Sequence, residues 1–245
     1  MRNFKLTLCY DGTRYKGWQK QGNTDNTLQG KLETLLTRLL ETPVEVNGCG
    51  RTDAGVHARM QVCSFRAETE MKTEEMLVLI RRYLPADIGA ISLEEADSRF
   101  HARLCCREKT YCYRLYTGTA PDVFERAYRL AFSEPLNIAA MKKAAGLMCG
   151  TYDCSAFTSD KHMKKSKVRT ITEIRIEQKE KETDLFFTGN GFLYNMVRIM
   201  TGTLLEVGTG KRPAEEIPAV VAGMDRQKAG FTAPPHGLFL WDIRY

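Results

Sequence analysis

Hydrophobic residues alternate with polar ones at the start of the chain and recur at helical spacing soon afterwards. Alternation over residues 4–10 predicts a half-buried strand, and leucines recurring from 28 to 40 predict a helix whose buried stripe belongs to the core. Thr27 can cap the start of this helix, and Pro43 marks its end. The intervening residues 11–26 are rich in glycine and polar side chains and predict a long loop.

The same patterns predict strands and helices over the rest of the chain. Strands are expected at 44–48, 61–65, 88–93, 109–116, 169–176, 184–188 and 239–243. Helices are expected at 74–83, 138–148 and 193–207, the last with Gly208 as its C-cap. Because strands and helices alternate, we expect a sheet covered by helices on one face. A boundary near residue 105 divides the chain into an N-terminal half, 1–104, and a C-terminal half, 105–245.

Composition places the chain among ordinary globular proteins. Of its 245 residues 43% are hydrophobic and 27% are charged, and no apolar segment precedes a small-residue cleavage site near the N-terminus. We therefore expect a cytoplasmic protein without membrane spans. The 8 cysteines include no Cys-x-x-Cys pair and no histidine at zinc-ligand spacing, so we expect buried thiols and no metal.

Charge favours an anionic partner. The chain has 36 Lys and Arg against 30 Asp and Glu, a net charge of +6. Acidic residues collect at 68–75 and 177–184, whereas basic residues gather at 51–59 and 99–114, which predicts one basic face suited to nucleic acid. Basic residues are also dense over 161–169, where they can bind a phosphate backbone or form a solvated loop.

Residues 48–58 combine three glycines with charged groups and an imidazole. Glycine allows tight turns and close approach of a ligand to the main chain. Asp53 could then act as a nucleophile or general base, with Arg51 favouring its ionised form. The alternative is an ordinary turn, because aspartate beside glycine often hydrogen-bonds its own backbone.

Residues 50–58, Gly-Arg-Thr-Asp-Ala-Gly-Val-His-Ala, resemble the signature of the tRNA pseudouridine synthase A family. Residues 10–21, 189–198 and 233–238 are similar to its other motifs, so the resemblance covers nearly the whole chain. At Tyr152 and Cys154 the family more often has His and Phe, which leaves the role of that loop open.

The resemblance implies an α/β fold of two similar halves, each an antiparallel or mixed sheet with helices packed on one face, and an active cleft between them. It implies a homodimer that needs no cofactor. Its activity is the conversion of uridine to pseudouridine in the anticodon stem-loop of tRNA, at positions 38, 39 and 40.

The resemblance also assigns site residues. Asp53 is the catalytic residue, and the sequence leaves open whether it attacks ribose C1′ or removes a sugar proton. Arg51 and Arg198 hold Asp53 or adjacent phosphates. Tyr111 contacts the substrate, although the strand pattern alone does not distinguish it from Tyr113.

Further substrate contacts follow from the resemblance, charge and aromatic character. Leu238 lies against the target base in the family pattern. Candidate RNA-binding residues are Arg14, Lys16, Trp18, Arg59, Arg103, Lys161, Lys164, Lys165 and Arg169. Trp18 could equally anchor its loop to the core.

Two other functions are compatible with parts of the sequence. A non-catalytic RNA-binding module would keep the basic face but would not need Asp53 in a glycine-rich loop. An enzyme that acts on free nucleosides would need paired carboxylates and little basic surface.

Overall fold

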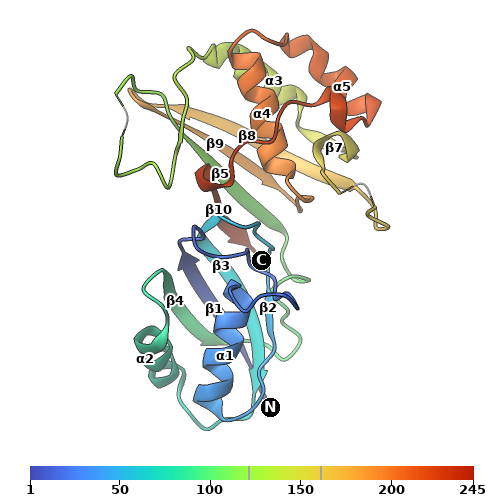
Figure 1. The fold of residues 1–245 in the computed structure, drawn as a ribbon. Coiled ribbons are helices and arrows are strands. Elements are labelled where there is room, and N and C mark those ends of the chain that lie inside the picture. The colour runs from blue at the N-terminus through green and yellow to red at the C-terminus, as the bar shows by residue number, and fades with distance from the viewer. Residues whose placement is uncertain (121, 161) are drawn as a thin grey trace. The chain divides into compact units, whose positions relative to one another are not determined.

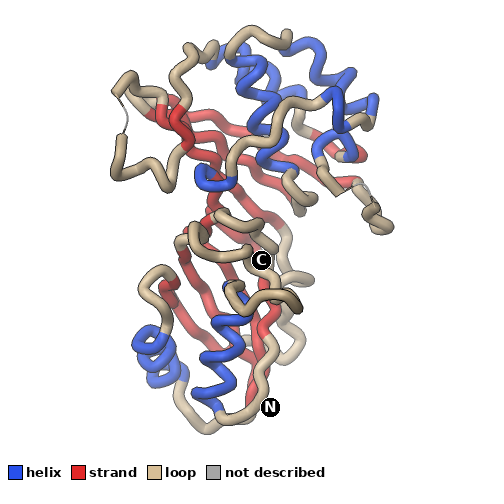
Figure 2. The backbone as a smooth tube through the Cα atoms, in the orientation of Figure 1, coloured by secondary structure: helices blue, strands red, loops and turns tan. Residues whose placement is uncertain are grey.

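The computed structural model describes residues 1–120, 122–160 and 162–245, which form two compact units. The first unit comprises Met1–Arg107 together with Phe239–Tyr245, and the second comprises Glu108–Leu238. Each unit has a β-sheet with helices packed against it (Figure 1), and loops join these elements (Figure 2). The expected α/β fold of two sheet-and-helix halves is confirmed. The last strand, which the sequence division assigned to the second half, packs in the first unit.

The sheet of the first unit has the strand order β4-β1-β3-β10, and β2 also pairs with β3. Its strands are β1 Arg2–Tyr10, β2 Val46–Gly48, β3 His57–Ala67, β4 Ile88–Glu95 and β10 Leu238–Arg244. β10 runs parallel to β3, and the other pairs are antiparallel. Phe4 lies opposite Phe65, and their rings stack at 5.1 Å between centroids.

β1 buries every second residue from Phe4 to Tyr10, and Lys5 and Cys9 on the other face stay partly exposed, which confirms the prediction of a half-buried strand. Asn3, which precedes the predicted range, is buried as well. The Asn3 amide donates hydrogen bonds to the carbonyl oxygens of Asp97 and Phe100, at 2.7 and 2.9 Å. The segment after β4 therefore covers β1 at Asn3.

Helices α1 (Leu28–Leu40) and α2 (Thr73–Tyr83) pack on one face of this sheet (Figure 1). The Thr27 hydroxyl accepts a hydrogen bond from the Gly30 amide at 3.2 Å, which confirms the predicted N-cap. α1 ends before Pro43 as expected, although Glu41 takes the left-handed cap position with φ 55°.

The sheet of the second unit has the order β5-β9-β8-β7, all antiparallel, and β6 pairs in parallel with β5. Its strands are β5 Glu108–Tyr116, β6 Leu130–Ala131, β7 Gly150–Asp153, β8 Val168–Gln178 and β9 Glu182–Gly189. Its α-helices are α3 Ile138–Leu147, α4 Met196–Gly208 and α5 Ile217–Gly223. Short 3₁₀ turns occupy Ser155–Phe157, Ala214–Glu216, Arg226–Lys228 and Pro235–Gly237. The predicted hairpin is confirmed as β8 and β9, with a shorter tip.

α4 begins later than predicted. Asn195 has φ 60°, so the chain turns there, and Leu193 is buried in the preceding loop. Gly208 is the last helical residue and Thr209 is the C-cap, so the predicted cap was one residue early. The left-handed conformation that favours glycine occurs at Gly210, with φ 74°.

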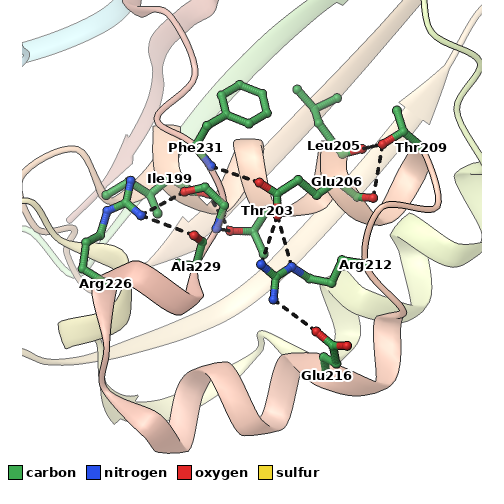
Figure 3. Close-up of polar contacts among 11 residues, drawn as sticks. Ile199, Thr203, Leu205, Glu206, Thr209, Arg212, Glu216, Arg226, Ala229 and Phe231 are labelled. Carbon is green, nitrogen blue, oxygen red and sulfur yellow. Dashed lines mark hydrogen bonds and ion pairs between the residues drawn. The ribbon is translucent and has the colours of Figure 1, made fainter.

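The segment after α5 is fastened onto α4 by polar contacts (Figure 3). The Gly230 amide donates to the Thr203 hydroxyl at 2.9 Å, and the Phe231 amide donates to the Glu206 carboxylate at 3.3 Å. The Arg226 guanidinium donates to the Gly230 carbonyl at 2.9 Å. These contacts fix the chain shortly before it enters β10.

Candidate active site

Asp53 lies on the loop between β2 and β3, as the sequence predicted. Gly55 has φ 77° and lets the chain reverse, and the Val56 amide donates to the Asp53 carbonyl at 3.1 Å. The turn therefore uses main-chain atoms of Asp53. Asp53 as a residue is partly exposed.

Buried side chains form hydrogen bonds that hold the loop that carries Asp53. The Gln61 amide on β3 donates to the Gly50 carbonyl at 2.8 Å, and Gln61 has no exposed surface. The Thr52 hydroxyl hydrogen-bonds the hydroxyl of Tyr10, the last residue of β1, at 2.8 Å. No site role was predicted for Tyr10, Thr52 or Gln61, because their hydrogen bonds join segments that are far apart in the sequence.

The segment after β1 packs directly on this loop. The Trp18 amide donates to the Thr52 carbonyl at 3.0 Å. Trp18 is 2% exposed, and its ring lies where a side chain on Gly48 would be. Its burial supports the loop-anchor interpretation and leaves no ring face for a base.

Arg51 is exposed beside Asp53, and its guanidinium has no ion-pair partner among the described residues. An exposed arginine in this position can bind a phosphate. The predicted role of Arg51 at Asp53 or at a phosphate stays a prediction.

In the second unit, Tyr111 and Tyr113 lie on β5 in different environments. Tyr111 is 7% exposed and makes an edge-on contact with the Phe192 ring, at 5.2 Å between centroids. The Tyr113 hydroxyl donates to the Pro234 carbonyl at 2.9 Å, and burial raises the pKa of this phenol. The Tyr113 hydroxyl is therefore engaged by the Pro234 carbonyl. The alternation of residues along the strand could not show this contact.

Arg198 lies in the first turn of α4, as expected. Its guanidinium donates to the Ala233 carbonyl and to the Asn195 side-chain oxygen, both at 2.7 Å. The Ala233 amide in turn donates to the Arg198 carbonyl at 3.1 Å. Arg198 therefore holds the segment that leads to Leu238, which is itself 5% exposed.

The basic residues predicted to bind RNA are mostly on the surface. Arg14 is 77% exposed and pairs with Asp87 at 2.7 Å, and the Arg59 guanidinium lies over the Trp241 ring at 5.0 Å. Four exposed members have no ion pair or ring contact with other residues that the structure describes: Lys16, Arg103, Lys164 and Lys165. Arg169 is partly buried, and Lys161 lies outside the described residues.

We also looked for a cavity, a metal site and membrane-spanning helices. A cavity of about 750 Å³ along α1, lined partly by Lys31, Arg38 and Tyr83, contains none of the predicted site residues. Within the described ranges, no cluster of histidine, cysteine or acidic residues could hold a metal. The helices described there are all too short or too polar to cross a membrane.

Comparison with known proteins gives consistent matches. A family model described as "tRNA pseudouridine synthase" matches residues 8–103 and 144–245; Asp53, Arg198 and Leu238 lie inside these segments and Tyr111 between them. The chain is 42% identical to "tRNA pseudouridine synthase A" of Bacillus sp. (strain KSM-64), over the full length of both. Two proteins named "tRNA pseudouridine synthase A 2" also match over their full length, at 39% identity in Bacillus anthracis and 41% in Clostridium perfringens. A chain in the solved "Crystal Structure of a Cbf5-Nop10-Gar1 Complex" is 12% identical, with a TM-score of 0.37, over 83% of this chain and 45% of that one.

Proposed function

The chain belongs to the tRNA pseudouridine synthase family, and we propose that it converts uridine to pseudouridine in the anticodon stem-loop of tRNA, with Asp53 as the catalytic residue. The observation that carries the proposal is the position of Asp53, a partly exposed residue on a loop fixed between β2 and β3. The target positions are those that the family resemblance implies.

The reaction rearranges bonds within one nucleotide. The bond from ribose C1′ to uracil N1 breaks, the base turns, and a bond from C1′ to C5 forms. C5 loses a proton and N1 gains one, so the reaction consumes no oxidant, reductant or cofactor. Asp53 either attacks C1′ and is later displaced by C5, or removes a sugar proton to release the base.

The other site residues support this step in the proposal. Tyr111 stacks on the base and assists loss of the C5 proton, and Leu238 packs against the base. Arg51 and Arg198 hold the carboxylate or neighbouring phosphates. Tyr111 and Leu238 are largely buried in the structure without RNA. A base can therefore contact these two side chains only by displacing protein atoms that cover them.

Access to the glycosidic bond requires the uridine to leave its stack. Extrusion costs a few kcal/mol, which contacts between protein and RNA must offset. The exposed cations Lys16, Arg103, Lys164 and Lys165 supply such contacts in the proposal. We further propose a homodimer, which rests on the family resemblance. A cytoplasmic location suits the tRNA substrate and the eight cysteines, all free thiols.

The test is incubation of the purified protein with unmodified tRNA transcripts, followed by mapping of pseudouridine. New pseudouridine in the anticodon stem-loop is the expected result, and a transcript with cytidine at those positions should yield none. Binding of tRNA without any product would instead support a non-catalytic module. Conversion of free uridine would support an enzyme of nucleosides.

A further inference from the structure

Tyr10 ends β1 and reaches the residue next to Asp53. Its hydroxyl and that of Thr52 are hydrogen-bonded at 2.8 Å in a buried position. A second bond, from the Trp18 amide to the Thr52 carbonyl, comes from the other end of the same segment. Thr52 is therefore held through both its side chain and its main chain by residues 10–18.

The same segment packs against the loop without intervening side chains. A Cβ on Gly17 would lie 2.7 Å from the Thr52 carbonyl oxygen, and one on Gly12 would lie 1.9 Å from the Val56 carbonyl oxygen. The Gly12 amide also donates to Nδ1 of the buried His57 at 3.1 Å. Contact between the two backbones on both sides of Asp53 couples the position of the loop to that of residues 10–18.

We propose that Tyr10 is a positioning residue whose hydroxyl, acting through Thr52, fixes the direction of the Asp53 carboxylate. The inference rests on the proposed function of Asp53. Neighbouring Cα atoms are about 3.8 Å apart, so a displacement of Thr52 passes directly to Asp53. Reacting groups tolerate little misplacement: a shift of about 1 Å can cost about 100-fold in rate.

The effect of the Tyr10 hydroxyl can be tested separately from that of the Tyr10 ring. Tyr10 packs against Trp18 with ring centroids 6.2 Å apart, and phenylalanine would keep this contact. Burial raises the pKa of Tyr10, so its hydroxyl stays protonated at neutral pH and available for the hydrogen bond. Tyr10→Phe should thus remove the contacts of the hydroxyl with Thr52 and with Gln61 and keep the packing of the ring.

Tyr15 provides a matched control. It is 5% exposed, like Tyr10, and lies on the same segment. Its hydroxyl donates to the Asp87 carboxylate at 2.6 Å, away from the catalytic loop. Tyr15→Phe therefore removes a hydrogen bond between a buried tyrosine and a charged acceptor, of at least equal strength, and leaves Thr52 untouched.

The experiment compares single-turnover rates, tRNA affinity and melting temperature of Tyr10→Phe and Tyr15→Phe on a tRNA that the wild type modifies. We expect the rate of Tyr10→Phe to fall about 10-fold to 100-fold with tRNA Kd within about twofold of wild type. Tyr15→Phe should lose at least as much stability and keep the wild-type rate. Equal effects of the two variants on rate, or an unchanged rate in Tyr10→Phe, would overturn the proposal.

Thr52 gives an independent arm should Tyr10→Phe fold poorly. Thr52→Ser keeps the hydroxyl and should retain most of the rate, whereas Thr52→Val should lose as much as Tyr10→Phe. The double variant Tyr10→Phe with Thr52→Val should be no slower than Tyr10→Phe alone, because both substitutions remove the same hydrogen bond. Additive losses would contradict the coupling. Absence of pseudouridine with the wild type would refute the proposed function itself, a separate outcome.

Discussion

Asp53 contributes main-chain atoms to a turn and a carboxylate to the proposed chemistry, and one substitution separates the two. Asp53→Asn keeps the carbonyl that accepts from the Val56 amide, but an amide side chain cannot act as nucleophile or base. We expect turnover to vanish while melting temperature and tRNA affinity stay near wild type. Pseudouridine mapping, thermal unfolding and filter binding on the same preparation check this. Product formation at a comparable rate would reject Asp53 as the catalyst.

Tyr111 and Tyr113 lie two residues apart on β5, and the proposed function gives a role in the chemistry to the Tyr111 hydroxyl. Tyr111→Phe keeps the ring, including its edge-on contact with Phe192, so tRNA should bind nearly normally while turnover falls steeply. Tyr113→Phe removes the bond to the Pro234 carbonyl and should cost about 1 kcal/mol of stability with turnover retained. Rate measurements and denaturant unfolding of both variants decide the assignment. If only Tyr113→Phe is slow, the proton step belongs to Tyr113.

At the scale of elements, the periodicity of a helix and its buried stripe were predictable, whereas burial that depends on distant segments was not. The leucine spacing and Thr27 identified α1 with its N-cap, because both signals are local. β3 runs from His57 to Ala67, longer than the predicted 61–65, because most of its residues are buried on either face and its pattern does not alternate. The polar composition of 11–26 hid the burial of Trp18, which depends on a partner 30 residues away at Gly48.

Two glycines in the loop segment 11–26 allow a test of whether this segment is packed against the rest of the protein. Gly17 has φ 93° and no room for a Cβ, so Gly17→Ala should destabilise the fold by more than the roughly 1–2 kcal/mol that left-handed backbone costs. Gly22 lies in the same loop with nothing within 4 Å of its Cβ position, so Gly22→Ala should change stability by less than about 0.5 kcal/mol. Denaturant unfolding of the two variants measures the difference. Equal stabilities would show that the segment is not packed as described.

At the scale of the whole molecule, the limit of sequence reasoning is the pairing of distant segments. The pattern at 239–243 identified a strand, and β10 covers it. Nothing in that pattern showed that Phe239 would pair in parallel with His57, because a strand's sequence records its buried face and not its neighbour. The same holds for the contact between Tyr10 and Thr52, 42 residues apart. The family motifs mark such residues without showing their contacts.

The net charge of +6 predicts that tRNA binding is electrostatic, and the distribution of lysines allows a stricter test. With about four to eight phosphate contacts, log K should fall with log salt with a slope of about −3 to −7. Neutralising exposed Lys164 and Lys165 to glutamine should lower the magnitude of that slope by about 2, since each lost phosphate contact removes about 1.

The control variant removes two positive charges at a different part of the surface. Lys143 and Lys211 are exposed too but pair with Glu215 and Glu134, so we expect their change to glutamine to leave the slope nearly unaltered. Both double variants reduce the net charge from +6 to +4, because each loses two lysines. Measuring tRNA affinity across a salt series for wild type and both variants therefore separates local contacts from overall charge. Equal slopes in the two variants would remove residues 164 and 165 from the RNA interface, and salt-independent affinity in the wild type would refute electrostatic binding altogether.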